Sequence, residues 1–391
     1  MSSSPAGRRR GSAPDASAPR VVVAGGGTGG HLYPGIAVAR ELLTRQPAAT
    51  VSFAGTARGL EARVVPREGF GFDVIRSGGL KGKSMRDRVK GAALIPLGVV
   101  DAWRIVTARR PDLVIGVGGY SSGPVVLVAA LRGIPTMVLE QNAIPGLTNR
   151  LLARLVRAAA VSFESTREYF GSRAFVSGNP VRSEFFDEAW GEQQSKSDGG
   201  TRVLVFGGSQ GAHAINLAMV EAASELANEG SRLRLTHQTG ERDLEMVRVA
   251  YRERNLAADV EPFLDDMGRQ IRQADLVVCR AGATTLAEIT AAGKAAVLIP
   301  LPTATDDHQR KNAEALVASG AAELLLQRDL NGHVLAARIL ALAGDRERRE
   351  RMARAARGLA RPDAARVIVD RALEMMRRFD EKVRRSPDAA N

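Results

Sequence analysis

Residues 21–31 read VVVAGGGTGGH, and residues 203–213 repeat the pattern as VLVFGGSQGAH. Each copy joins a short apolar run to a cluster of glycines, and a helix-like stretch follows. An unbroken apolar run is typical of a parallel strand that is buried on both faces. Glycines at a strand-to-helix turn let backbone N–H groups approach an anion. The repeat therefore predicts an α/β protein with two Rossmann-like domains, whose parallel sheets face a central ligand cleft.

Further apolar runs alternate with helical patterns in both halves of the chain. In the first half, strand-like runs lie at residues 21–24, 50–54, 113–117, 136–139 and 158–162. In the second half, they lie at 203–206, 234–236, 260–263, 276–279 and 296–299. The charged stretch that follows predicts amphipathic helices with a break at Pro362.

Changes in composition indicate the limits of the units. We expect a disordered tail, an N-terminal Rossmann-like domain, a polar linker, a C-terminal Rossmann-like domain, and a C-terminal helix and tail. These occupy residues 1–19, 20–185, 186–200, 201–360 and 361–391. The tail has no apolar core of a secretory signal, and no apolar run reaches the roughly 18 residues that span a bilayer.

The basic charge lies in the first half, where residues 1–185 hold 25 Lys and Arg against 12 Asp and Glu. Nucleic acid, an anionic membrane or a polyanionic substrate would each suit such a surface. Aromatic residues make up only 4% of the chain, which disfavours base stacking. The single cysteine, Cys279, excludes an internal disulfide and is expected to be a buried hydrophobe.

Basic residues stand beside an apolar stretch in the first half. Lys81, Lys83 and Arg86 precede the apolar residues 94–100, and Trp103 follows them. This combination predicts contact with a membrane interface. A solvated basic helix over an ordinary core is the alternative.

The glycine loops resemble a dinucleotide-binding fingerprint, which requires an acidic residue at the end of the next strand. The chain reads TVSFAGT at 50–56 and THQTG at 236–240, and neither segment supplies that acid. A nicotinamide or flavin cofactor is therefore disfavoured. The loops still suit diphosphates, with plain tight turns as the alternative.

Residues 279–288, CRAGATTLAE, combine a strand end, a small-residue turn and a helix start. The turn's N–H groups and the hydroxyls of Thr284 and Thr285 suit a diphosphate at the helix N-terminus. Glu288 lies one turn further along, where its carboxylate would accept from both ribose hydroxyls. The alternative is that Glu288 only complements the helix dipole.

Other polar residues follow expected strands and would face the cleft. His31 is a candidate general base because its ordinary pKa lies near neutrality, and Glu140 is a weaker one. Asp306 and Asp307 are interpreted as a helix N-terminal cap in preference to a metal site. His308 and Gln309 then follow, within reach of sugar hydroxyls.

Seven motifs together resemble the MurG family of peptidoglycan N-acetylglucosaminyltransferases, from about residue 20 to about residue 360. They are GGTGGH at 26–31, GGYSSGP at 118–124, EQN at 140–142, GLTN at 146–149, GNPVR at 178–182, GGSQG at 207–211 and the segment 279–288. The resemblance implies a GT-B fold. It also implies inverting transfer of GlcNAc from UDP-GlcNAc to the MurNAc 4-hydroxyl of undecaprenyl-diphosphoryl-MurNAc-pentapeptide (lipid I), which gives lipid II.

The resemblance also implies roles for single residues. The uracil would contact Leu264 and the ribose Glu288, while the diphosphate would contact Arg182, Ser209, Gln210, Ala283, Thr284 and Thr285. The GlcNAc would face Asn142, His308 and Gln309, although some family members have Gln in place of His308. Thr28, Gly29 and Gly30 would also contact the donor. The loop that contains them would, together with His31, face the acceptor. No metal or other cofactor is implied.

By the same resemblance, the partners would be UDP-GlcNAc, lipid I, an anionic inner-membrane surface and other cell-wall synthesis proteins, with no nucleic acid. The place of action would be the cytoplasmic face of the inner membrane, in cell-wall biogenesis, cell shape and cell division. Two rival hypotheses are a UDP-GlcNAc 2-epimerase-like enzyme and a basic nucleic-acid-binding module. The second rival would leave Glu288 and both glycine loops without a role.

Overall fold

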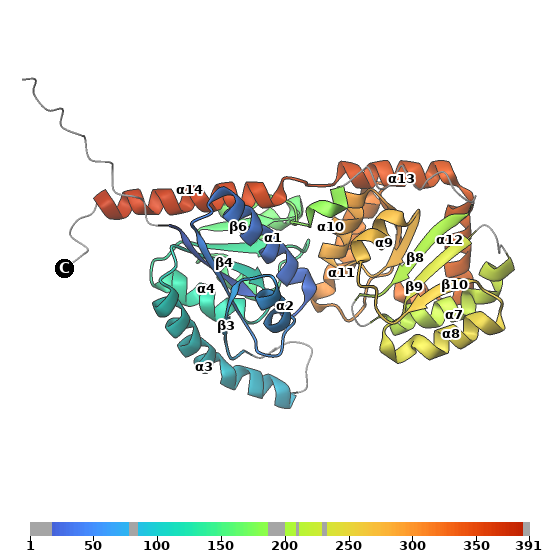
Figure 1. Ribbon diagram of the computed structural model, residues 1–391, viewed down its shortest axis with the longest axis horizontal. Coiled ribbons are helices and arrows are strands. Elements are labelled where there is room, and N and C mark those ends of the chain that lie inside the picture. The colour runs from blue at the N-terminus through green and yellow to red at the C-terminus, as the bar shows by residue number, and fades with distance from the viewer. Residues whose placement is uncertain (1–17, 78–84, 187–199, 209–210, 229–232, 386–391) are drawn as a thin grey trace, which may run out of the picture.

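The computed structural model describes residues 18–77, 85–186, 200–208, 211–228 and 233–385. Two α/β domains lie side by side, each built on one parallel sheet (Figure 1). The predicted fold class is confirmed.

The first sheet has the strand order β3-β2-β1-β4-β5-β6-β7. Its strands are β1 (Arg20–Gly25), β2 (Thr50–Gly55), β3 (Gly71–Val74), β4 (Leu113–Gly118), β5 (Thr136–Glu140), β6 (Ala158–Val161) and β7 (Ala174–Val176). The sequence analysis did not predict β3 and β7. These are the two edge strands, and both are short and only partly buried, so they lack a continuous apolar run.

Helices cover both faces of the first sheet. One face packs against α1 (Gly29–Arg45), α2 (Glu61–Arg67) and α14 (Ala364–Arg385). The other packs against α3 (Met85–Arg109), α4 (Ser122–Leu131) and α5 (Leu147–Leu152). The short 3₁₀ helices η1 (Glu164–Tyr169), η2 (Gly171–Arg173) and η3 (Ser183–Phe186) follow.

The second sheet has the order β10-β9-β8-β11-β12-β13, again with parallel pairing throughout. Its strands are β8 (Thr201–Phe206), β9 (Leu233–Gln238), β10 (Ala258–Glu261), β11 (Leu276–Cys279), β12 (Ala295–Leu298) and β13 (Ala322–Leu324). The edge strand β13, three residues long, was also not predicted. Cys279 is fully buried at the end of β11, as expected.

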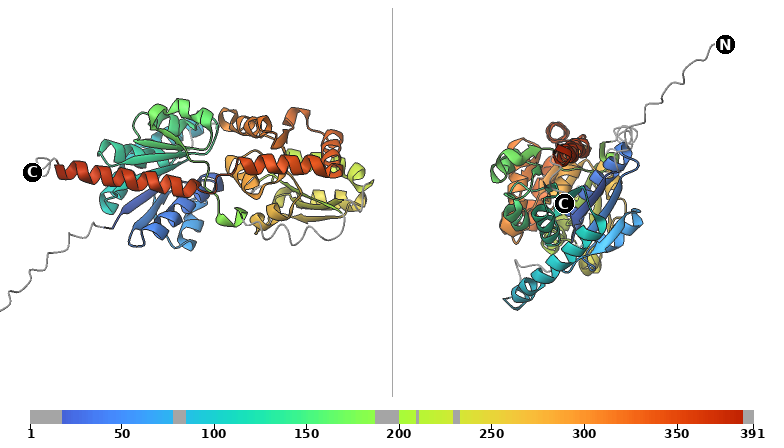
Figure 2. Two further views of the ribbon diagram at one scale, coloured as in Figure 1. Left: turned by 90° about the horizontal axis from the view of Figure 1, so that it is seen from above. Right: turned by 90° about the vertical axis from the view of Figure 1, so that its left-hand side faces the viewer.

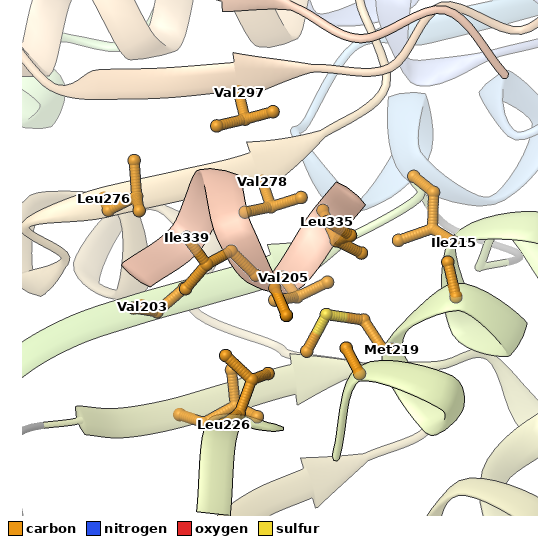
Figure 3. Close-up of a cluster of buried hydrophobic side chains, with 14 of the residues drawn as sticks. Val203, Val205, Ile215, Met219, Leu226, Leu276, Val278, Val297, Leu335 and Ile339 are labelled. Atoms are coloured by element: carbon orange, nitrogen blue, oxygen red, sulfur yellow. The ribbon is translucent and has the colours of Figure 1, made fainter. Parts of the chain in front are cut away.

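Alternate side chains of these strands enter two different cores. One core packs against α7 (His213–Asn228), α8 (Leu244–Glu253) and α12 (Gly332–Gly344). Figure 3 shows Val205 and Val278 of the sheet near Leu335 and Ile339 of α12. The opposite core packs against α9 (Met267–Gln273), α10 (Ala283–Ala292), α11 (His308–Ala318) and α13 (Arg346–Gly358). The remaining 3₁₀ helices are η5 (Glu241–Asp243), η6 (Thr305–Asp307) and η7 (Gln327–Asp329).

The chain crosses between the domains twice, at places that differ from the expected limits. Phe185, expected in the N-terminal unit, is 1% exposed in the core of the C-terminal domain. The helical stretch breaks near Pro362 as predicted, but α14 then returns to the N-terminal domain (Figure 2). Ile368, Val369 and Ala372 of α14 are buried in the core of the first sheet. The last helix therefore ties the two domains together.

Among the described residues, no helix is both long and apolar enough to cross a membrane. The apolar stretch at 94–100 lies within α3, which continues through Pro96.

We predict that Ile368→Ala destabilises the N-terminal domain by about 2–5 kcal/mol, because it removes buried methyl groups and leaves a cavity. Urea unfolding followed by a probe in that domain would measure this loss. The exposed Arg377→Ala, two turns further along α14, should leave the midpoint close to that of the unmodified chain. Equal midpoints for all three proteins would show that α14 adds nothing to the N-terminal core.

Candidate active site

A cavity of about 320 Å³ lies between the two domains. Its walls are the loops that follow β1, β4 and β5 of the first sheet and β11 and β12 of the second. In an open parallel sheet, ligands bind at the carboxyl ends of the strands, beside the point where the strand order reverses. Here that point lies between β1 and β4 in one domain and between β8 and β11 in the other. Both domains therefore offer their binding edges to one cavity.

Many of the expected site residues line this cavity. They are Thr28, Gly30, His31, Glu140, Asn142, Ala283, Thr284, His308 and Gln309. Gly29, Arg182, Leu264, Thr285 and Glu288 do not line it. Ser209 and Gln210 lie outside the described residues.

The first glycine loop holds its shape with an internal carboxylate. Gly25, Gly26 and Gly27 have φ of 137°, 141° and 88°, values that L side chains rarely adopt. The N–H of Gly27 donates to Glu61 Oε2 at 2.7 Å. Glu61 is 0% exposed. One donor of the loop therefore binds the protein itself, although the sequence suggested that both loops offer their N–H groups to phosphate.

His31 is the third residue of α1 and lies against the end of β4. A Cβ on Gly118 would stand 2.8 Å from His31 Cδ2, so the ring fits only because that position is glycine. Burial lowers the pKa of His31 below its ordinary value, which keeps the imidazole neutral at pH 7. A neutral imidazole facing a cavity can accept a proton.

Glu140, the other candidate base, is buried and fully engaged. Its two oxygens accept from Asn142 N at 3.0 Å, Asn142 Nδ2 at 3.1 Å, Gly146 N at 3.0 Å and Asn149 Nδ2 at 2.9 Å. Burial raises the pKa of Glu140 in spite of these donors. Because all four donors belong to residues 140–149, the Glu140 carboxylate stabilises the conformation of this loop.

The turn before α10 reaches across to the first domain. Thr284 Oγ1 donates to the carbonyl of Gly30 at 2.9 Å and accepts from Asn179 Nδ2 at 3.2 Å. The start of α10 at Ala283 agrees with the sequence prediction. The N-terminus of α10 therefore opens toward the loop that carries His31.

Asn312 on α11 of the C-terminal domain is hydrogen-bonded to the loop 140–149 of the N-terminal domain. It is 0% exposed, accepts from Ala143 N at 2.8 Å, and donates to Asn142 Oδ1 at 3.1 Å. With its Nδ2 on Glu140, the Asn142 amide is bound on both sides. The expected sugar contact of Asn142 therefore requires these bonds to rearrange.

The cap interpretation of Asp306 and Asp307 is wrong. Asp307 occupies the N-cap position of α11, but its backbone is left-handed and its side chain makes no capping hydrogen bond. The Asp306 carboxylate instead forms an ion pair at 2.7 Å with Arg150 of the other domain. Asp306 thus forms an interdomain contact, and His308 and Gln309, which follow at the start of α11, line the cavity.

The side-chain oxygen of Gln309 is bound within the protein. Its Oε1 accepts from Ala281 N at 3.2 Å and Leu301 N at 3.0 Å, which leaves its amide N–H groups for a ligand. His308 faces the same cavity, and its positive form would disfavour protonation of His31.

Glu288 lies deeper on α10, as expected from its spacing. Burial raises its pKa to about 7, although the nearby Arg182 guanidinium partly offsets this effect. Arg182 lies over the rings of Tyr33 and Phe185, at 5.6 and 5.3 Å from their centroids. Leu264 lines a separate groove with Arg269 and Gln270 of α9.

A second, apolar pocket of about 250 Å³ adjoins the cavity on the N-terminal domain. Leucines 94, 127, 151, 152 and 155 line it, and it shares Tyr120, Leu147 and Thr148 with the cavity. Leu151 in its lining is 70% exposed, and Trp103, one turn beyond the lining residue Val99 on α3, is 54% exposed. Lys81 and Lys83 lie outside the described residues, and for Arg86 only the backbone, in α3, is described.

Sequence reasoning missed Glu61, Arg150 and Asn312. Each acts through a partner far away in the chain, and no local spacing predicts such a pairing. Among the described residues, no three His, Cys, Asp or Glu side chains gather as a metal ion would require.

Comparisons with known proteins agree with this geometry. The glycosyltransferase family 28 N-terminal domain matches residues 21–161, and the family's C-terminal domain matches residues 202–368. A protein of Anaeromyxobacter sp. (strain K) is 51% identical over 360 residues, 92% of this chain and 94% of that protein. A Geobacter metallireducens protein is 50% identical over 359 residues, 91% of this chain and 98% of that protein. Both are named UDP-N-acetylglucosamine--N-acetylmuramyl-(pentapeptide) pyrophosphoryl-undecaprenol N-acetylglucosamine transferase.

Among solved structures, Acinetobacter baumannii MurG aligns with a TM-score of 0.73 and 33% identity, over 90% of this chain and 98% of that one. A Neisseria meningitidis UDP-GlcNAc 2-epimerase bound to UDP-GlcNAc aligns with a TM-score of 0.65 at 15% identity, over 91% of this chain and 99% of that one. The second likeness concerns the fold alone.

Two Rossmann-like domains that share one cleft define a GT-B glycosyltransferase fold. The chain belongs to glycosyltransferase family 28, and within it to the MurG family. The resemblance drawn from the sequence motifs is confirmed.

We predict that Asn312→Ala loosens the domain interface. The change removes the acceptor of the Ala143 N–H and the donor to Asn142 Oδ1, at a cost of about 1–3 kcal/mol. Hydrogen exchange in residues 140–149 should accelerate, while Asn228→Ala, at an exposed position on α7, should not change it. Unchanged exchange in the Asn312 variant would contradict an interdomain role for this side chain.

Proposed function

We propose that the protein transfers GlcNAc from UDP-GlcNAc to the MurNAc 4-hydroxyl of lipid I, with inversion, and thereby forms lipid II. The observation that carries the proposal is the position of α10. Its N-terminus opens at the cavity, Glu288 lies one turn behind, and His31 lies on the opposite wall. The names of the relatives at 50–51% identity support the same reaction.

The donor would lie along α10. Glu288 would accept from the ribose hydroxyls, and the N–H groups of Ala283, Thr284 and Thr285 would meet the diphosphate together with Arg182, Ser209 and Gln210. A helix N-terminus stabilises the negative charge that develops on the leaving UDP, so we propose that transfer needs no bound metal. Leu264 remains the proposed uracil contact, and Asn142, His308 and Gln309 the proposed GlcNAc contacts.

His31 is the proposed general base. As the acceptor oxygen bonds to C1 of GlcNAc, the bond from C1 to the diphosphate oxygen breaks, and the acceptor proton passes to the imidazole. Neutral His31 has one unprotonated ring nitrogen at pH 7, whereas both oxygens of Glu140 accept from N–H donors, four in all. This difference favours His31 over Glu140.

A 2-epimerase shares the fold but requires no lipid acceptor. The apolar pocket adjoins the cavity and shares Tyr120, Leu147 and Thr148 with it. Apolar side chains at the mouth of a sugar-binding cleft suit a substrate with a hydrocarbon chain. This arrangement favours a lipid-linked acceptor.

The first test is incubation of the purified protein with UDP-GlcNAc, with and without a lipid I analogue. We expect UDP release only with the acceptor, together with a disaccharide-lipid product detected by mass spectrometry. Acceptor-independent release of UDP with a ManNAc-type product would indicate the epimerase instead.

Glu288→Ala should weaken UDP-GlcNAc binding by tenfold or more, since it removes charge-assisted hydrogen bonds of roughly 1.5–3 kcal/mol. Titration calorimetry would measure this. Because the carboxyl has a pKa of about 7, donor affinity should also fall as the pH drops through 7, where the carboxylate is lost. Unchanged affinity in the variant would contradict the proposed contact between Glu288 and the ribose hydroxyls.

We propose further that the N-terminal domain docks on the anionic cytoplasmic face of the inner membrane. Exposed Leu151 lines the apolar pocket, and Trp103 and Leu131 are exposed on α3 and α4, the helices that supply its lining residues Val99 and Leu127. The basic excess lies in the same half of the chain. Apolar side chains beside cations are the combination that interfacial binding requires. Other cell-wall synthesis proteins are proposed partners at that surface, in cell division and cell shape.

Replacing Lys81, Lys83 and Arg86 together by Gln should reduce binding to anionic vesicles roughly tenfold or more, at about 1 kcal/mol for each charge. Flotation with phosphatidylglycerol vesicles would measure this effect. Neutral phosphatidylcholine vesicles serve as the control, and equal binding of both proteins to anionic vesicles would contradict the proposed membrane face.

A further inference from the structure

We propose that Glu61, a residue without direct access to the substrates, positions His31 and supports its basicity for the transfer reaction. The inference rests on the proposed role of His31 as the general base.

Glu61 is a fully buried carboxylate at the start of α2, 0% exposed, beneath the first glycine loop. Its Oε2 accepts from Gly27 N at 2.7 Å. Its Oε1 accepts from Thr56 N and Thr56 Oγ1, each at 2.9 Å. Burying an ionised carboxylate is costly unless it is hydrogen-bonded, and three donors provide that compensation.

Three glycines form a cradle around this side chain. A Cβ on Gly26, Gly55 or Gly59 would stand 2.5, 2.5 or 2.1 Å from the nearest atom of Glu61. The loop 25–27, the end of β2 and the turn before α2 therefore close on one carboxylate. The glycine cluster, which the sequence suggested for a phosphate, accommodates an internal anion at this point.

The same loop contacts His31 directly. The backbone of Gly26 hydrogen-bonds to the His31 ring, and Gly26 N donates to Gly118 O at 3.4 Å. The His31 ring in turn packs against Gly118. Glu61 thus fixes one side of the loop, and the end of β4 fixes the other. Movement of the loop would move the ring.

Glu61 also acts on His31 through its negative charge, in addition to holding the glycine loop in place. The negative charge of Glu61, from α2, favours the imidazolium that forms when His31 takes the acceptor proton, while His308 of α11 opposes it. The other groups that face this part of the cavity include Thr28, Thr284 and Glu140, and burial raises the pKa of Glu140 while its four donors favour the charged form. Loss of the Glu61 charge should therefore lower the pKa of His31 further.

The test is Glu61→Gln in the full-length enzyme, assayed from pH 5 to 9 with UDP-GlcNAc and a lipid I analogue. The Gln side chain removes the negative charge, and its amide N–H faces the donors of Gly27 and Thr56 that the carboxylate accepted from. We expect kcat to fall about tenfold or more, with the KM for UDP-GlcNAc within about twofold. The acid limb of kcat at saturating UDP-GlcNAc, where titration of Glu288 no longer limits donor binding, reports protonation of His31 and should move to lower pH by up to about one unit.

Two variants separate charge from shape. Glu61→Asp keeps the charge on a shorter side chain, so it should lose rate while its acid limb stays in place. Thr56→Val removes the hydroxyl that donates to Glu61 and keeps the carboxylate. This variant carries the test if Glu61→Gln does not fold. Its acid limb should also stay in place, while kcat falls by less than in Glu61→Gln. Glu68→Gln, the same chemical change on the surface beside Arg40, is the matched control and should behave like the unmodified enzyme.

His31→Gln is measured in parallel. If it abolishes transfer while Glu61→Gln keeps the original rate and pH profile, the positioning role is overturned and the base assignment stands. If His31→Gln retains full rate, the base assignment fails, and the inference about Glu61 fails with it. Equal losses in the Gln and Asp variants, with no movement of the acid limb, would also overturn the proposal, because they indicate a purely structural role.

Discussion

The parallel arrangement of the strands is the constraint on which the rest of this molecule depends. A parallel pair requires a crossover connection, so all strands of a sheet end at the same edge. Each domain therefore collects its loops and helix N-termini along one edge. The two edges meet in a single cavity, where residues from β1, β5 and β11 stand together although they lie far apart in the chain. The returning helix α14 and the Arg150–Asp306 pair then join the two domains.

The two glycine loops, nearly identical in pattern, have different surroundings. In the first loop, the Gly27 N–H is already bound to Glu61. In the second, Gly208 O accepts from Gln238 Nε2 at 2.9 Å, and a Cβ on Gly211 would stand 1.9 Å from Thr239 O. Both loops need glycine for close backbone approach, but among the described residues, which exclude 209–210, a carboxylate bonded to a loop N–H is seen only in the first. A negative charge there disfavours a diphosphate, which agrees with a donor site on the C-terminal domain.

Three buried carboxylates illustrate how hydrogen-bond donors decide function. Glu61 and Glu140 are each bound by at least three donors, and they stabilise loops. Glu288 has a raised pKa of about 7 and lies beside Arg182. Among the described residues no hydrogen bond to Glu288 is seen, and such a carboxylate suits a ligand that brings its own donors, such as the hydroxyls of a ribose.

The sequence by itself determined the two-domain α/β architecture, because continuous apolar runs and glycine turns are local patterns. It also determined the family, a helix start at Ala283 or Thr284, and the spacing that puts Glu288 one turn deeper. The edge strands β3, β7 and β13 escaped prediction because short, half-exposed strands carry little apolar signal. Only the tertiary structure decided that Asp306 pairs with Arg150, that Asn312 joins the walls of the cavity and that Glu61 fills the first glycine loop. The Asp306 and Asn312 contacts form only once both sheets have folded and their edges face each other, whereas Glu61 meets the glycine loop as soon as the first domain has folded.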